Sequence, residues 1–207
     1  MCDLKYYERI RNCLRIYVKE GCVMELINRM IRAARLDVSL YEEVEKDVKA
    51  TDQAILVVII ASICAGIGGA IEKISGGLGG IIFGLVLGVI TALIGWFIWS
   101  FITYFIGTRV FKGPKTKATY GELLRCIGFS SSPGVIRILS FISILGPVIV
   151  FVAMIWSLVA MVVAVRQALD FSTGRAIATC LVGFIVLVVI SAAVAMLTAG
   201  LFNILPM

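Results

Sequence analysis

The sequence predicts an all-α, polytopic membrane protein with five transmembrane helices and short N-terminal amphipathic helices. Apolar residues make up 60% of the 207-residue chain, above the roughly 45–50% of an ordinary soluble domain. They gather in long runs after residue 53, whereas charged residues gather before it. We therefore expect a cytoplasmic amphipathic region, residues 1–52, and a membrane domain, residues 53–207.

Four apolar runs are long enough for a helix to cross a bilayer core of about 30 Å. The expected spans are about 54–71, 80–104, 147–165 and 176–201. The second run ends with Trp96, Trp99 and Tyr104, and such aromatic residues are typical of the headgroup level.

A fifth span is predicted at 121–145, where polar residues interrupt the apolar pattern. We interpret it as a kinked span, and a re-entrant or interfacial helix is the alternative. An arginine at the centre of an inserted helix costs about 2.5–3.5 kcal/mol. Arg137 is therefore expected either to face a cavity or partner, or to reach the outer headgroups. Glu122 and Arg125 are, with Arg137, the candidates for buried polar residues, and they lie near the inner interface, where salt bridges or headgroup contacts are expected.

Basic residues in short loops predict the orientation of the spans. With five spans, ten Lys/Arg before Thr51 lie on the side of the N-terminus. Later loops add Arg109, Lys112, Lys115, Lys117, Arg166 and Arg175 to that side. The opposite side holds Lys73, and Arg137 if its side chain extends outward. The N-terminus is therefore predicted to be cytoplasmic and the C-terminus to lie outside.

Three amphipathic helices are predicted before the first span. The first spans residues 4–17, and the second places Arg29, Arg32 and Arg35 opposite an apolar face. The third begins at Ser39, with a capping box to Glu42. A basic amphipathic helix can lie on anionic lipid, at about 1 kcal/mol per basic residue. Docking against the membrane helices or a partner is the alternative. The net charge of +6 thus indicates a lipid surface and no nucleic acid.

A ladder of small residues at every fourth position runs along the second span. Small residues on one helix face let helix backbones approach closely in a membrane. Packing within this one bundle is one explanation, and a contact surface for another subunit or a second copy is the other. The ladder consists of Gly76, Gly80, Gly84, Gly88 and Ala92.

The side chains that most enzymes need are missing. The chain contains no histidine, the commonest general base and transition-metal ligand. The six cysteines have no metal-binding or redox spacing, and no carboxylates are paired for acid–base chemistry. We predict no enzyme activity, no catalytic or metal-binding residues, and no cofactor.

Three segments give the chain a family resemblance that covers roughly residues 22–200. They are RAARLDVSLYEEVEKD, TYGELLRCIGFSSSPGV and AMIWSLVAMVVAVRQALDFSTGRAIAT. The chain resembles the prokaryotic branch of the Yip (Ypt/Rab-interacting protein) family. The resemblance implies five spans, a cytoplasmic N-terminus and a short outer C-terminus, here in a prokaryotic cytoplasmic membrane. The eukaryotic branch is tied to vesicle trafficking and small GTPases, but its long Pro/Gln/Tyr-rich tail and D-L-Y-G-P element are missing here. The resemblance supplies no functional residues.

These features predict a non-enzymatic scaffold or accessory subunit that packs against other membrane proteins, or against itself, or organises lipid. The small-residue ladder, the basic helices and the lack of a catalytic constellation support this prediction. The alternative is a small transporter or channel with a polar path near Arg137 and Pro133, because broken helices with buried polar groups often line substrate paths.

Overall fold

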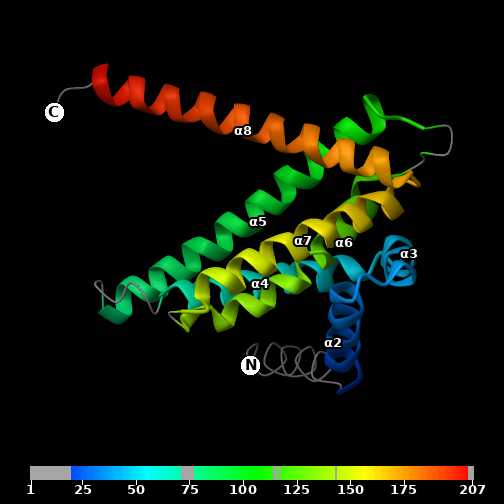
Figure 1. Cartoon of the computed structure of the whole chain (residues 1–207), viewed down its shortest axis with the longest axis horizontal. Helices are drawn as coiled ribbons and strands as arrows, with labels where there is room; N and C mark the ends of the chain where they lie inside the picture. Colours follow the sequence, from blue (N-terminus) through cyan, green and yellow to red (C-terminus); the bar gives the residue numbers. More distant parts are fainter. Residues whose placement is uncertain (1–19, 71–76, 114–115, 117, 143, 205–207) are drawn as a thin grey trace, which may run out of the picture.

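The computed structural model describes residues 20–70, 77–113, 116, 118–142 and 144–204 (Figure 1). Every regular element in these ranges is helical, which confirms the all-α prediction there. The predicted helix at residues 4–17 lies outside them. The elements are α2 (Glu20–Ala34), α3 (Val38–Lys46), α4 (Ala50–Ala70), α5 (Gly77–Arg109), α6 (Tyr120–Phe129), the 3₁₀ helix η2 (Ser132–Phe141), α7 (Gly146–Ala168) and α8 (Thr173–Ile204).

Four of the described helices are long and apolar enough to cross a membrane. The qualifying segments are Ala50–Gly69, Gly79–Arg109, Gly146–Ala168 and Thr173–Ala192. They correspond to the four long apolar runs. Because these helices are apolar on all sides, the chain is a multi-pass membrane protein rather than a soluble bundle.

The segment predicted as a kinked fifth span consists of two short helices of different type. α6 ends at Phe129, and the 3₁₀ helix η2 begins at Ser132 with Pro133 in its first turn. Proline has no N–H to continue an α-helical ladder. Ser130 and Ser132 also donate hydroxyl hydrogen bonds to carbonyls three residues back, at 2.7 Å each. Neither ten-residue helix is long enough to cross alone, so the described residues contain four candidate spans.

The broken segment lies inside the bundle. η2 packs against both α4 and α7, while α6 packs against α4, α5 and α7. The crossing of α4 and α6 is close: a Cβ added at Gly128 would come within 2.7 Å of the Ala54 Cβ. Figure 1 shows α4, α5 and α7 running the length of the molecule, with α8 diverging from them towards its C-terminal end. The polar residues of the segment are therefore covered by neighbouring helices.

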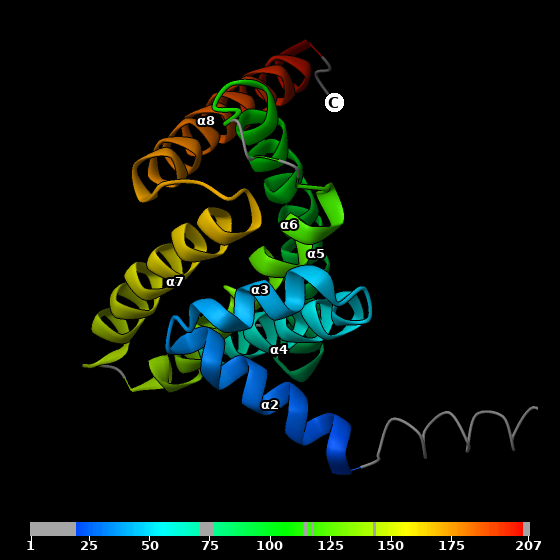
Figure 2. The same cartoon turned by 90° about the vertical axis from the view of Figure 1, so that its right-hand side faces the viewer.

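The N-terminal helices pack against one end of this bundle (Figure 2). α3 contributes fully buried Leu40, Tyr41 and Val44 to the main core. The same core contains Leu123 and Cys126 of α6 together with Val165 of α7 and its C-cap residue Leu169. The docking alternative predicted for this region is the arrangement that α3 adopts.

The start of α3 differs from the prediction. Asp37, not Ser39, is the N-cap, and its carboxylate accepts a hydrogen bond from the Ser39 backbone N–H at 3.0 Å. The reciprocal capping box occurs elsewhere, between Thr119 and Glu122 at the start of α6. Asp is as good an N-cap as Ser. Because Asp37 lies two residues before Ser39, its carboxylate can accept a backbone N–H of the first turn of α3.

Candidate functional site

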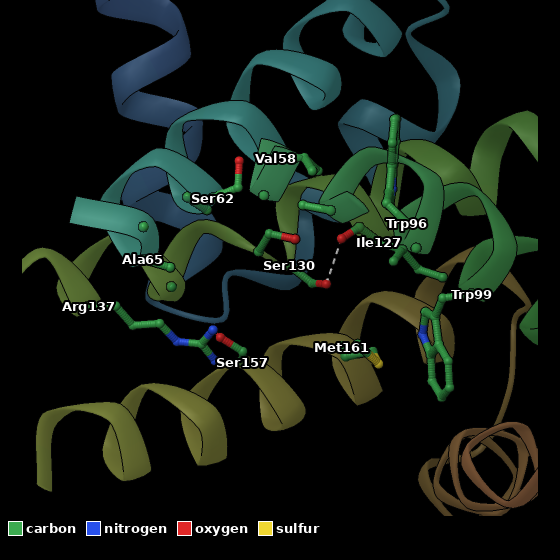
Figure 3. A pocket seen from close by; sticks show the side chains of 17 residues that line it. Val58, Ser62, Ala65, Trp96, Trp99, Ile127, Ser130, Arg137, Ser157 and Met161 are labelled. Atoms are coloured by element: carbon green, nitrogen blue, oxygen red, sulfur yellow. Dashed lines mark hydrogen bonds between the residues drawn. The ribbon is translucent and has the colours of Figure 1, made fainter. Parts of the chain in front are cut away.

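A cavity of about 570 Å³ lies between α4, α5, α7 and the α6–η2 segment (Figure 3). Its size falls within the range of about 300–1,000 Å³ that is usual for small-molecule sites. The wall combines small residues, hydroxyls, two tryptophans and one charge. It is formed by Val58, Ala61, Ser62, Ala65, Gly66, Gly88, Ala92, Gly95, Trp96, Trp99, Ile127, Ser130, Ser131, Gly134, Arg137, Ser157 and Met161.

Arg137 is the only charged residue in this wall. Its backbone lies against α4, because a Cβ added at Gly68 would collide with the Arg137 carbonyl oxygen. Its side chain extends from η2 towards Ser157 of α7 (Figure 3). Nε is buried without a hydrogen-bond partner, and none of the ion pairs within the described residues involves this guanidinium. The positive charge is therefore unneutralised at the cavity wall.

A second donor at the wall also lacks a partner. The indole Nε1 of Trp99 is buried and unpaired, whereas Trp96 donates its indole N–H to the Leu124 carbonyl at 3.1 Å. The hydroxyls of Ser62 and Ser130 are already used, as each donates to a carbonyl of its own helix. An unmade buried hydrogen bond costs about 1–3 kcal/mol, so the cavity favours a guest that supplies acceptors.

The predicted small-residue ladder divides into parts with different surroundings. Ala92 packs against the buried core, and Gly88 lies at the edge of the cavity. Gly80 and Gly84 are exposed, and a Cβ at either would meet no atom within 4 Å. Gly76 lies outside the described residues. Within the described bundle, the Gly80–Gly84 stretch is thus not a helix-packing contact.

Arg125 and Glu122 have separate roles in the structure. The buried Arg125 donates from Nε to the Val44 carbonyl at 2.8 Å and from a terminal nitrogen to the Glu45 carbonyl. Both acceptors lie in the last turn of α3, where carbonyls are unpaired and the helix dipole is negative. Glu122 caps α6 through the Thr119 N–H at 2.7 Å. The sequence marked Arg125 as polar and buried, but nothing in its spacing indicated a partner about 80 residues away.

The three arginines predicted for a lipid surface are not equivalent. Arg29 is buried and forms salt bridges with Glu25, Glu43 and Asp47, all within 3.1 Å. Arg32 pairs with Asp37 and Glu43 at 2.8 Å each. Arg35 is exposed. The charges of Arg29 and Arg32 are therefore largely neutralised by carboxylates of the same region, which leaves Arg35 as the open candidate for lipid contact.

These pairings change the acidity of the carboxyl groups in the α2–α3 region. The hydrogen bonds from Arg32 and Ser39 lower the pKa of Asp37 from its ordinary 3.8 to about 2. The hydrogen bond from Arg32 also lowers the pKa of Glu43. Burial raises the pKa of Glu45, with added repulsion from Glu122 and Asp170. The α2–α3 turn thus favours ionised Asp37 and Glu43, whereas the docked end of α3 disfavours ionised Glu45.

Comparison with known proteins gives a family. The profile of the Yip1 domain matches residues 39–196, which include α3 as well as the membrane helices. Proteins of this family are generally non-enzymatic membrane trafficking proteins. Searches of curated proteins and of solved structures gave no match. The match covers well over half of the 207 residues, so the chain belongs to the Yip1 domain family.

Proposed function

We propose that this protein is a non-enzymatic membrane scaffold or accessory subunit that binds a transmembrane helix of another membrane protein, or of a second copy, on the glycine face of α5. The observation that supports this proposal is the open Gly80–Gly84 stretch. Both glycines are exposed, without a neighbour within 4 Å of an added Cβ. Such spacing is characteristic of helix pairs in membranes, because it allows close backbone approach.

The surroundings of these glycines are consistent with a helix contact. Phe83 and Leu87 are both at least half exposed and lie next to the two glycines around the helix, so apolar side chains border the glycine strip. Lipid tails solvate such side chains as well as the apolar side chains of another helix do. Helix association in a bilayer is therefore driven by close packing and not by the hydrophobic effect. A strip of small residues between larger side chains provides the groove that such packing requires.

We further propose that α6 and η2 together form the third of five crossings. Ten α-helical and ten 3₁₀ residues would reach about 35 Å end to end, enough for a core of about 30 Å. Non-helical backbone at membrane depth needs cover from protein, which α4 and α7 supply. Figure 1 shows α4 starting on the right-hand side, where α5 and α7 end. That side carries Arg109, Arg166 and Arg175 and is proposed to be cytoplasmic, by the positive-inside rule.

We assign the chain to the prokaryotic branch of the family, in a cytoplasmic membrane, as part of the same proposal. The support is that the printed sequence contains no D-L-Y-G-P element. A role in binding small GTPases is not part of the proposal.

The experiment is extraction of the tagged full chain from native membranes in a mild detergent, followed by mass spectrometry of proteins retained at fixed stoichiometry. The test variant is Gly80→Leu/Gly84→Leu, which fills the glycine strip. Gly79→Leu is the matched control, because Gly79 is equally open but about 100° around the helix from Gly80. We expect the double variant to lose the retained protein or self-association, while the control keeps it. Equal retention of the partner protein by the wild type, the double variant and the Gly79→Leu control would refute the proposed contact.

A small transporter or channel is the second candidate, favoured by the cavity beside Arg137 and by the helix break at Pro133. It predicts that purified protein in liposomes passes a solute and that Arg137→Ala changes the flux. An unchanged leak across a broad panel of ions and solutes would reject this candidate.

A further inference from the structure

The cavity has a polar end and an apolar end. Arg137 and Ser157 lie together at one end, and Trp96 and Trp99 lie towards the other (Figure 3). Met161 and Val58 add apolar surface to the wall. A guest that fits both ends is an amphiphile with an anionic group and an apolar body.

The polar end also lies at the appropriate depth for a lipid headgroup. The Arg137 carbonyl contacts Gly68, two residues before α4 ends at Ala70. Val58, at the apolar part of the wall, is ten residues earlier on α4, or about 15 Å along the helix. This distance is half of a bilayer core of about 30 Å. The polarity of the cavity therefore follows the polarity of one lipid leaflet, from the surface to the midplane.

The arginine at the polar end identifies the charge of the guest. Arg137 Nε is buried and unpaired, and none of the wall residues is Asp or Glu. Arginine matches phosphate particularly well, because its planar guanidinium donates two parallel hydrogen bonds. In a membrane, the abundant molecule that combines a phosphate with an apolar body is a phospholipid.

We propose that this cavity binds the phosphate headgroup of an anionic membrane phospholipid, with Arg137 as its anchor and the tryptophan end against an acyl chain. This site is separate from the glycine face of α5 proposed for protein contact. The two proposals can fail independently, because filling Gly80 and Gly84 leaves Arg137 and the wall serines unchanged.

The test is native mass spectrometry of the delipidated full chain given equimolar phosphatidylglycerol and phosphatidylcholine with identical acyl chains. We expect one tightly retained phosphatidylglycerol, preferred by about tenfold or more, which corresponds to about 1.4 kcal/mol. Arg137→Gln should remove the preference, and Arg137→Lys should restore part of it. Arg109→Gln is the control, because Arg109 is exposed at the end of α5 and should leave the preference intact.

A second variant keeps the proposal testable if Arg137→Gln does not fold, as judged by circular dichroism and elution profile. Ala65→Leu retains the arginine but fills the wall of the cavity, and it should also remove the retained lipid. Retention of phosphatidylglycerol by Ala65→Leu, or an unchanged preference in folded Arg137→Gln, would overturn the proposal.

Inorganic phosphate alone distinguishes a lipid headgroup from a free anion. Millimolar phosphate should neither bind the delipidated protein detectably nor displace phosphatidylglycerol. If it displaces the lipid, the site is one for free phosphate and the lipid assignment is wrong. An equal affinity for phosphatidylcholine in the wild-type protein would likewise contradict the anionic headgroup.

Discussion

Arg125→Met should release α3 from the membrane helices. In the structure, the buried guanidinium donates to the carbonyls of Val44 and Glu45 in the last turn of α3. Hydrogen bonds from a charged donor contribute about 1.5–3 kcal/mol each. Methionine keeps most of the side-chain volume but donates no hydrogen bond, and water can partly replace the donors. Two bonds at the lower end of that range give a loss of about 3 kcal/mol, or a roughly hundredfold rise in the open population of α3.

Hydrogen–deuterium exchange of the protein in lipid nanodiscs measures this change directly. Amides of residues 38–46 should exchange faster in Arg125→Met, while those of α5 keep their protection, since opening would be local. Arg109→Met serves as the control, because Arg109 is exposed. Unchanged exchange in α3 would refute the inference that Arg125 holds the N-terminal helices in place.

Two further predictions concern the α2–α3 turn and the packing of η2. The pKa of Asp37, about 2, is below the ordinary value of 3.8, so the ionised carboxylate stabilises the fold fully at pH values above 3.8. Asp37→Asn should therefore destabilise the turn at neutral pH. The difference in amide exchange rates between the wild type and Asp37→Asn should shrink as the pH falls from about 4 to about 2. Exchange rates that differ equally at both pH values would contradict this prediction. Gly68→Ala should lower the melting temperature, since its Cβ would collide with Arg137 and Ser140, whereas a Cβ at Gly69 meets no atom. We expect a cost of about 1–3 kcal/mol for Gly68→Ala and little for Gly69→Ala, and equal melting temperatures would count against the described contact of α4 with η2.

The long membrane helices could be predicted from sequence because hydrophobicity alone identifies them. A helix in a bilayer core must satisfy its own backbone and present apolar side chains. The run at 147–165 therefore falls within α7 of the structure, and the run at 54–71 falls within α4 as far as residue 70. The break in the segment at 121–145 was predicted as a kink, but its form, an α-helix followed by a 3₁₀ helix, could not be, because an apolar pattern does not distinguish the two helix types. Pro133 and the serines next to it were the local signal of the change.

Contacts between distant segments could not be predicted. Arg29 and Arg32 looked like one basic helix face, but their carboxylate partners come largely from α3 and the adjoining turns. Arg125 bonds to carbonyls, which every residue has, so no sequence pattern marks its partner. The cavity likewise depends on residues from five different helices, α4, α5, α6, η2 and α7. The sequence identified Arg137 as a residue in need of a partner, and the structure added the wall around it.

The most direct test of the central proposal is photo-crosslinking from the glycine face of α5 in native membranes. A photoreactive residue at Leu87, which is about half exposed beside the strip, should crosslink to one discrete protein or to a second copy of this chain. The same probe at Val189 of α8, which is equally apolar and exposed, should give only lipid adducts. Loss of the Leu87 crosslink in Gly80→Leu/Gly84→Leu would support a scaffold that binds through this face. Lipid adducts alone from Leu87 would contradict it.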